Sequence, residues 1–226
     1  RGCFNAEEPM APLAKPENIN YVDDSGHAGI DALNLLPKIP WDKQLEPHWN
    51  IGEEGARKRF ETFVNEGLSF YKDGRNLPAK PYVSRLSPYL HFGEISPNQL
   101  WHAVRSIGDD KHIEHFCSEL GWREFSHSQL YHNPDLPQKN LQPKFDRFPW
   151  ANDAAALTAW QKGKTGVPMV DAGMRELWQT GYMHNRVRMI VGSFLVKNLR
   201  LHWHHGERWF WDTLVDADLA HNACGW

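Results

Sequence analysis

The sequence predicts an all-α fold. Apolar side chains recur at helical spacing from Gly52 onward, and serine–proline pairs mark the starts of helices. No stretch of useful length alternates apolar and polar residues as a strand does. Internal repeats and low-complexity tracts are also missing from the sequence. Together these observations predict one helical domain over residues 51–226.

Residues 1–50 precede this domain and have a different composition. They show little periodicity and contain many prolines, which are Pro9, Pro12, Pro16, Pro37, Pro40 and Pro47. Proline interrupts helices and removes a backbone donor, so such a segment is typical of an extended connector. We expect residues 1–50 to be an interdomain linker.

The first long element of the domain is an amphipathic helix that begins near Gly52. Its apolar positions, spaced for one helix face, are Ala56, Phe60, Phe63, Val64 and Leu68. The helical period returns in segments 111–131, 153–161, 168–180, 184–199 and 206–214. Glycines punctuate these later segments, at Gly163, Gly166, Gly181 and Gly206.

Two helix starts between these segments carry a clear local signal. Ser87-Pro88 and Ser96-Pro97 each place a hydroxyl before a proline, which suits an N-cap followed by the first helical position. Gln99 lies three residues after Ser96, so this pair is expected to form a capping box. We therefore expect helices to begin at both serines.

Composition excludes several classes of protein. No run approaches the roughly 20 apolar residues of a membrane span, and the N-terminus lacks a secretory pattern, so a cytoplasmic protein is expected. Cys3, Cys117 and Cys224 lie far apart, which predicts free thiols, without disulfides and without a metal site. A net charge of -3 requires any DNA contact to use local positive charge, while 11 tryptophans indicate binding of an aromatic group.

Two segments near the C-terminus have complementary charges. TGYMHNRVRM (180–189) contains Arg186 and Arg188, and DADLAHNACGW (216–226) contains Asp216 and Asp218. Opposite charges on neighbouring helices predict that the segments meet. Taken alone, such a pair is more often a structural salt bridge than part of a ligand site.

Four strings together carry a more specific signal: SRLSPYL (84–90), WREF (122–125), TGYMHNRVRM and DADLAHNACGW. From about Tyr71 onward the chain resembles the photolyase and cryptochrome family. The resemblance implies a helical domain that binds FAD, incomplete at its C-terminal end. It also implies a separate N-terminal α/β antenna domain, outside this sequence, that holds a chromophore such as a folate or a deazaflavin.

The resemblance implies a set of cofactor-binding residues. The FAD phosphates would lie at Tyr71, Ser84, Arg85, Leu86 and Ser87, since hydroxyls and free amides at a helix start bind anions. Val83 stands where the family usually has threonine, which removes one hydroxyl. The isoalloxazine ring would lie beside Arg188, Asp216, Ala217, Asp218 and Asn222, with the Asn222 amide facing N5. His221, commonly asparagine in bacterial relatives, receives no role.

A second set of residues would bind damaged DNA. The rim of the cavity would comprise Glu119, Trp122, Asn185 and Met189, with Trp122 stacking on a flipped-out dimer. The arginines assigned to DNA are Arg75, Arg123 and Arg186. Relatives that repair the (6-4) photoproduct carry histidines at positions 185 and 189, so cyclobutane dimers are the expected lesion. Without the resemblance, a single Trp in a helix is more often a core residue.

Three tryptophans match the family's electron relay between flavin and surface: Trp226, Trp203 and Trp150. The resemblance therefore implies a deoxyribodipyrimidine photo-lyase, which repairs cyclobutane pyrimidine dimers in DNA with light and reduced FAD, and works as a monomer.

Two alternatives stay open. A cryptochrome would use the same flavin and tryptophans for blue-light sensing, and a non-catalytic helical DNA-binding domain would not bind FAD. His184 is expected to support packing near the cavity.

Overall fold

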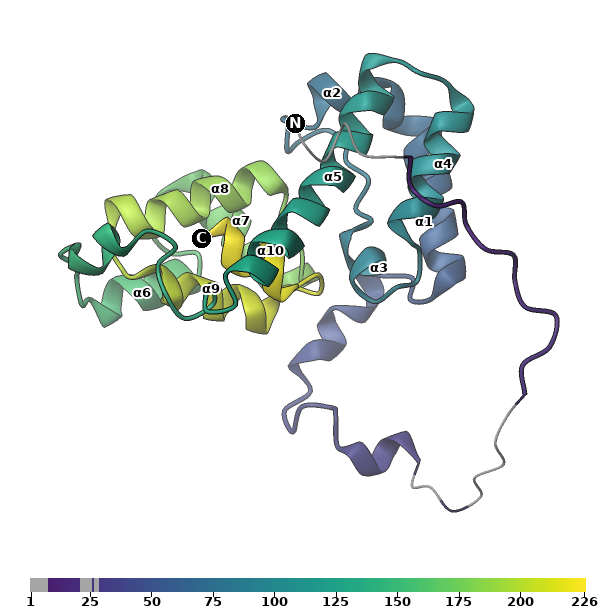
Figure 1. Ribbon diagram of the computed structural model, residues 1–226. Helices are drawn as coiled ribbons and strands as arrows, with labels where there is room; N and C mark the ends of the chain where they lie inside the picture. The colour runs from purple at the N-terminus through teal and green to yellow at the C-terminus, as the bar shows by residue number, and fades with distance from the viewer. Residues whose placement is uncertain (1–7, 21–25, 27–28) are drawn as a thin grey trace.

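A computed structural model describes residues 8–20, 26 and 29–226 (Figure 1). Within these residues the secondary structure is helical, with one isolated parallel bridge between Ala151 and Leu201 and no strand. The all-α prediction is confirmed. No helix in the described ranges combines the length and the apolar character needed to cross a membrane. Cys117 and Cys224 are free thiols, as expected, and Cys3 lies outside the described residues.

The helices follow one another along most of the chain. The α-helices are α1 Glu53–Glu66, α2 Tyr71–Gly74, α3 Ser87–His91, α4 Pro97–Ile107, α5 Lys111–His132, α6 Ala154–Gln161, α7 Pro168–Thr180, α8 Asn185–Ser193, α9 Trp203–Thr213 and α10 Leu219–Gly225. A π-helical turn, Phe194–Asn198, continues α8. Short 3-10 turns are Ile30–Leu33, Trp41–Gln44, Glu46–His48, Leu68–Phe70 and Pro143–Arg147. The predicted segments 111–131, 153–161, 168–180 and 184–199 agree with these bounds to within a residue or two.

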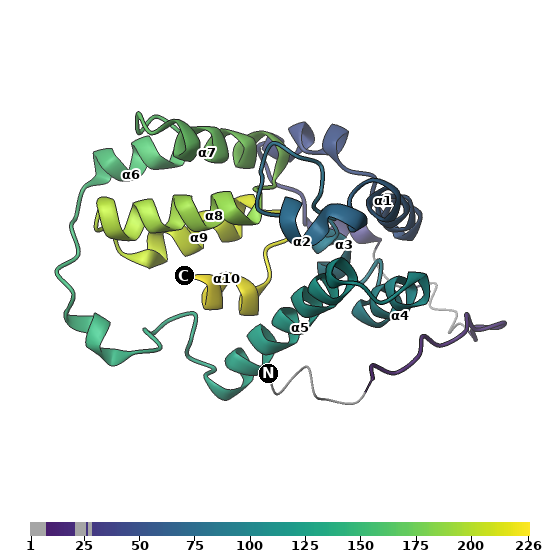
Figure 2. The same ribbon diagram turned by 90° about the horizontal axis from the view of Figure 1, so that it is seen from above.

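The helices pack around two apolar cores. The first core lies among α1 to α5 and includes Phe63, Leu100 and Phe116. The second lies among α6 to α10 and includes Trp160 and Met174. Helix α5 is long enough to reach from the first core to α10 in the second, so it joins the two (Figures 1 and 2). The candidate site lies mainly in the second group of helices and also receives residues from α1, α3 and the loop before α3.

The segment before α1 contacts the end of α7. Gln44 Nε2 donates to the Trp178 carbonyl at 2.8 Å, and Trp49 Nε1 donates to the Thr180 carbonyl at 2.7 Å. The Trp41 ring stacks on Trp178 with centroids 6.2 Å apart. These contacts attach residues 41–49 to the helical domain, and the function of residues 1–50 as an interdomain linker stays a prediction.

Helices begin at both predicted positions, but only one of the two serines is an N-cap. Ser96 caps α4 by accepting from the Gln99 amide, and the Gln99 side chain completes the capping box. Ser87 is instead the first residue of α3, behind Leu86, and makes no capping bond. Its hydroxyl donates to Asp216 Oδ2 at 2.5 Å, a partner 129 residues away. A long-range bond therefore replaces the local cap.

The prediction that glycines mark the ends of helices is also confirmed only in part. Gly181 ends α7 in the left-handed region at φ 67°. Gly206 does not precede a helix, because α9 begins at Trp203 and runs through it. A Cβ atom at Gly206 would lie 2.1 Å from Cη2 of Trp226, so the glycine makes room for that ring. Its role is close packing and not helix termination.

Candidate functional site

An ion pair joins the two charged segments at the centre of the site. Arg188 Nη2 on α8 donates to Asp216 Oδ2 at 2.8 Å, and Arg188 Nε donates to the Met183 carbonyl at 2.8 Å. The same Asp216 oxygen accepts from the Ser87 hydroxyl of α3. The structure thus brings together residues from three of the four strings. Since the Asp216 side chain is only 3% exposed, this carboxylate is screened little by water.

A cavity of about 490 Å³ opens beside this ion pair. Arg188, Asp216, Ala217, Asp218 and Asn222 line it, all of them predicted flavin contacts. The rest of the lining comes from α8 and the π-helical turn, together with Phe210, Leu214, His221, Gly225 and Trp226. Its lining combines apolar and charged side chains, which is typical of a site for a largely aromatic ligand with a few polar groups.

The Asp216 carboxylate offers an unused acceptor. Its Oδ1 atom is buried and has no hydrogen-bond partner among the described residues, although Oδ2 accepts two bonds. A buried acceptor without a partner costs about 1–3 kcal/mol, so a ligand with a suitably placed N–H or O–H donor would bind favourably. The isoalloxazine and ribityl groups of FAD carry such donors. The residues present therefore fit a flavin.

Asn222 is anchored by Trp226 and by Glu207, a residue to which the sequence analysis assigned no role. Its Nδ2 donates to the Glu207 carbonyl at 2.9 Å and to Glu207 Oε1 at 3.1 Å, and its Oδ1 accepts from Trp226 Nε1 at 3.3 Å. Burial raises the pKa of the Glu207 carboxyl. The amide thus lines the cavity in a fixed orientation. Glu207 lies on α9, and no local pattern reveals a bond across 15 residues.

The predicted phosphate loop is held by an arginine that the sequence analysis missed. Arg59 Nε on α1 donates to the Ser84 carbonyl at 2.6 Å, and Arg59 Nη2 donates to the Val83 carbonyl at 3.1 Å. Ser84 Oγ accepts from the Leu86 amide at 3.4 Å. Arg85 adopts φ 55°, which is rare for a residue with a side chain. The loop is therefore in a defined, unusual conformation.

Arg85 and Tyr71, both assigned to the phosphates, have different surroundings. The Arg85 guanidinium lies 4.6 Å from the Tyr182 ring centre and 3.2 Å from Glu176 Oε1. Tyr71 is buried in the first core, where its ring makes edge contacts with Phe63 and Phe116. Burial raises the pKa of the Tyr71 phenol. Arg85 is half-exposed and available to an anion, whereas Tyr71 packs in the core.

Tyr182 and His184 belong to the site but were not predicted as contacts. Tyr182 is buried, and the guanidinium groups of both Arg85 and Arg188 lie over its ring. His184 caps α8 by accepting from the Arg186 amide through Nδ1, while its buried Nε2 has no partner in the described chain. Burial and nearby arginines lower the pKa of His184.

The predicted DNA-binding residues divide into two groups. Asn185 and Met189 line the cavity, and the exposed fractions of Met189 and Trp122 are 56% and 55%. Glu119 and Arg75 form an ion pair with each other in which Arg75 is only 9% exposed. Trp122 and Glu119 do not line the cavity in this structure.

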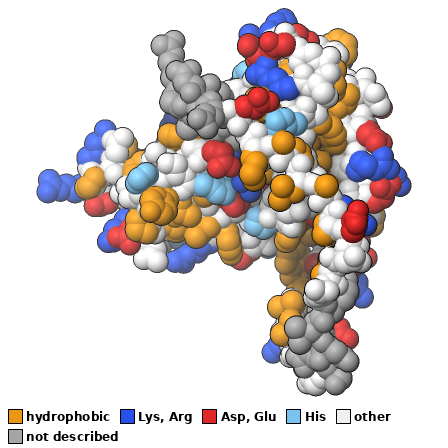
Figure 3. All heavy atoms as spheres, turned by 45° about the vertical axis from the view of Figure 1, so that its right-hand side comes forward, with side chains coloured by type: hydrophobic (Ala, Val, Ile, Leu, Met, Phe, Trp, Pro, Cys, Tyr) orange, Lys and Arg blue, Asp and Glu red, His pale blue; other side chains and the backbone are white. Residues whose placement is uncertain are grey.

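The remaining two arginines are held by neighbouring groups. Arg186 Nε donates to Asn76 Oδ1 at 2.7 Å, and Arg123 Nη2 lies 3.5 Å from the Leu90 carbonyl. On the face shown in Figure 3, lysine and arginine side chains lie beside acidic ones and form no single basic patch. This distribution agrees with the net charge of -3.

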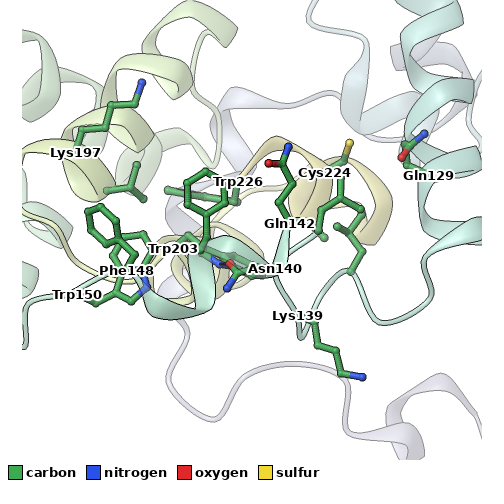
Figure 4. A pocket seen from close by; sticks show the side chains of 15 residues that line it. Gln129, Lys139, Asn140, Gln142, Phe148, Trp150, Lys197, Trp203, Cys224 and Trp226 are labelled. Carbon is green, nitrogen blue, oxygen red and sulfur yellow. Dashed lines mark hydrogen bonds between the residues drawn. The ribbon is translucent and has the colours of Figure 1, made fainter.

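The three tryptophans of the predicted relay lie around a second cavity. It measures about 610 Å³, and Trp150, Trp203 and Trp226 all line it (Figure 4). Trp203 Nε1 donates to Asn140 Oδ1 at 2.7 Å, and His202 contacts both the Trp203 and Trp150 rings. Trp226 lines both cavities. One indole ring therefore borders both the cavity beside the Arg188–Asp216 pair and the cavity lined by Trp150 and Trp203.

Known proteins resemble this chain throughout its length. A deoxyribodipyrimidine photo-lyase of Agrobacterium fabrum is 45% identical over 231 residues, which cover 100% of this chain and 48% of the relative. Cryptochrome-1 of Arabidopsis thaliana is 40% identical over 241 residues, 97% of this chain and 34% of the relative. The crystal structure of a bacterial class III photolyase from Agrobacterium tumefaciens matches with a TM-score of 0.93 and 45% identity, covering 99% of this chain and 47% of that one.

The chain thus spans about half the length of the curated photolyase it matches. Residues 116–226 match the family model for the FAD binding domain of DNA photolyase. This region contains α7 to α10, the Arg188–Asp216 pair and Trp226, which lines both cavities. By sequence, fold and family model, the chain belongs to the photolyase and cryptochrome family.

Proposed function

We propose that the protein to which this chain belongs repairs cyclobutane pyrimidine dimers in DNA with light, as a deoxyribodipyrimidine photo-lyase. The light-driven electron transfer in this proposal rests on the position of Trp226, which lines both the cavity beside the Arg188–Asp216 pair and the cavity bordered by Trp203 and Trp150. The choice of repair over light sensing rests on Trp122 and Met189. An aromatic ring in contact with both cavities can pass an electron between a bound flavin and the outer tryptophans. The proposal includes a monomer in the cytoplasm, with residues 1–50 as an interdomain linker.

The residues around the first cavity would hold and orient FAD. The ion pair between Arg188 and Asp216 places a positive and a negative group at one wall, and the unpaired Asp216 Oδ1 accepts a bond from the ring or ribityl chain. The Arg85 loop, fixed by Arg59, would hold the phosphates. When bound and reduced, FAD supplies under light the electron that splits the dimer.

The amide of Asn222 has a separate role in this proposal. As a neutral group it borders the ring without adding negative charge, whereas a carboxylate there would oppose a reduced anionic flavin. Its anchoring on Glu207 keeps the amide in place. Burial raises the pKa of the Glu207 carboxyl, so its charged form is less favoured than that of an exposed glutamate.

The lesion would enter from the rim that carries Asn185 and Met189. Trp122, more than half exposed, offers a face for stacking on an unpaired base. Arg75 and Glu119 bond to each other and would position this rim through their ion pair, and Arg123 and Arg186 supply positive charge nearby. A flipped base must be held both by stacking and by polar contacts.

A cryptochrome is the second candidate function, favoured by the 40% identity to Cryptochrome-1 of Arabidopsis thaliana. The two functions differ in the use of the rim. A light sensor has no need of an exposed tryptophan at position 122 or of a methionine in the lining of the cavity. Residues 122 and 189 therefore favour repair, and a non-catalytic DNA-binding domain would leave the fitted flavin site without a use.

Repair is tested with an oligonucleotide that contains one cyclobutane thymine dimer. The purified, FAD-loaded protein should restore the intact thymines under blue light and leave them unrepaired in the dark. Trp122→Ala should abolish repair without changing flavin photoreduction, whereas Trp211→Ala, which removes another exposed tryptophan, should leave both unchanged. Photoreduction without any repair by the unmodified protein would contradict the proposal and favour the cryptochrome.

A further inference from the structure

Asp218 lies among imidazole groups from different helices. Its Oδ1 is 2.6 Å from Nδ1 of His221 on α10, and its Oδ2 is 3.7 Å from Nε2 of His127 on α5. His91, at the end of α3, lies 4.0 Å from the same Oδ2. One ligand atom from each of His127, Asp218 and His221 lies within 4.8 Å of the other two.

We propose that His127, Asp218 and His221 form a binding site for a divalent transition-metal ion such as Zn²⁺. Two imidazoles and one carboxylate are donors that zinc and the later first-row metals prefer. Asp218 and His221 also line the cavity proposed to hold FAD, so the ion would lie beside that cavity, although zinc binding itself does not depend on light-driven repair. The spacing of cysteines predicts no metal site, and residues 127 and 218 lie too far apart in the chain for a local pattern to connect them.

Two ligand-atom separations lie within 1 Å of those in a zinc site, and all three ligand atoms lie within 4.8 Å of one another. With bonds of about 2.0–2.2 Å to nitrogen and oxygen, ligand atoms of a tetrahedral zinc site lie about 3.3 Å apart. The 3.7 Å separation between His127 Nε2 and Asp218 Oδ2 is close to this spacing. The 2.6 Å hydrogen bond between His221 and Asp218 would open by less than 1 Å as the ion replaces the shared proton.

The charge and exposure of the site also suit a cation. The ion-pair partners of the Asp218 carboxylate in the described chain are histidines, and neither lysine nor arginine pairs with it. The His127 and His221 side chains are 36% and 37% exposed, so an ion and a completing water can reach them. A bound ion would connect α5 to α10, which already pack together.

Equilibrium dialysis of the purified, untagged protein against Zn²⁺ alone tests the site after removal of metals with a chelator. We expect one ion per chain, and at least about tenfold weaker binding in His127→Ala and in His221→Ala. The controls are His132→Ala, an exposed histidine of the same helix α5, and Cys224→Ser, which removes a half-buried thiol. Both controls should bind as the unmodified protein does.

A second readout protects the test against misfolded variants. Zn²⁺ should raise the melting temperature of the unmodified protein and of His132→Ala, because ligand binding to the folded state stabilises it, and should not raise that of His127→Asn. Far-ultraviolet circular dichroism checks that each variant is helical. Failure of the unmodified protein to bind Zn²⁺, equal binding by His127→Ala, or loss of binding in Cys224→Ser would each overturn the proposal.

Discussion

Replacing Gly206 by alanine tests whether the packing around Trp226 sets both stability and electron transfer. The new Cβ atom would lie 2.1 Å from Cη2 and 2.5 Å from Cζ3 of Trp226, and 2.7 Å from Cδ2 of Leu195. Ordinary contact begins at 3.4 Å, so the indole must retreat by at least about 1.3 Å. Overpacking of this kind costs about 1–3 kcal/mol.

The expected net change in stability also includes the higher helix propensity of alanine. Alanine in the middle of α9 gains about 1 kcal/mol over glycine, so Gly206→Ala should lower the free energy of unfolding by up to about 2 kcal/mol. Gly192→Ala crowds the same ring less, because its Cβ atom would lie 3.3 Å from Trp226 Cζ3, and it should leave the free energy of unfolding almost unchanged. Gly225→Ala has no atom within 4 Å and should be neutral or slightly stabilising.

Two measurements check this series. Denaturant unfolding gives the free energies, and flavin absorbance under blue light with an electron donor gives the rate of photoreduction. Photoreduction should slow in Gly206→Ala, whose Trp226 ring is displaced, and stay unchanged in Gly225→Ala. Equal stability and equal photoreduction in Gly206→Ala and Gly225→Ala would refute the reasoning.

Three further predictions follow from the site. Asp216→Asn leaves Arg188 without its charge partner and should lower the free energy of unfolding by about 2–3 kcal/mol. This is less than for a fully buried pair, because the Arg188 side chain is 26% exposed. The same substitution should weaken FAD binding in a fluorescence titration, and an unchanged affinity would contradict the role given to this carboxylate. His184 has a lowered pKa, so the unfolded chain takes up more protons, and stability should fall as pH drops below about 6.5, by at most about 1.4 kcal/mol per pH unit. His184→Asn keeps a capping side chain and should flatten that slope, whereas an identical slope would show that this imidazole does not titrate on unfolding. Trp203→Phe should bind FAD normally and photoreduce it more slowly, and an unchanged rate in flash photolysis would exclude Trp203 from the relay.

The long, periodic helices were predictable from the sequence because burying one face leaves a regular apolar pattern. Segments 111–131 and 168–180 match α5 and α7 closely. Helix α10 has seven residues and α2 has four, and helices with so few turns are too short to show a periodic apolar pattern. The two missed helices include the one that carries Asn222.

Local signals failed where distant contacts decide the structure. Ser87 has a capping sequence but bonds to Asp216, and Gly206 resembles a helix stop but accommodates Trp226. In both cases the partner lies elsewhere in the chain, and a local pattern carries no information about it. The meeting of Arg188 with Asp216 was predictable because complementary charges occurred in two recognisable strings. The roles of Arg59 and Glu207 could not be predicted from the sequence, because each depends on a contact that only the folded chain creates.

The most direct test of the account is the absorption spectrum of the purified, FAD-loaded protein before and after blue light with an external electron donor. We predict the spectrum of a bound flavin that bleaches toward the reduced form, and slower bleaching when Trp226 is replaced by phenylalanine. A folded protein that takes up no FAD would contradict the assignment of the cavity around Arg188, Asp216 and Asn222. A bound flavin that bleaches equally fast without Trp226 would contradict the electron path between the two cavities.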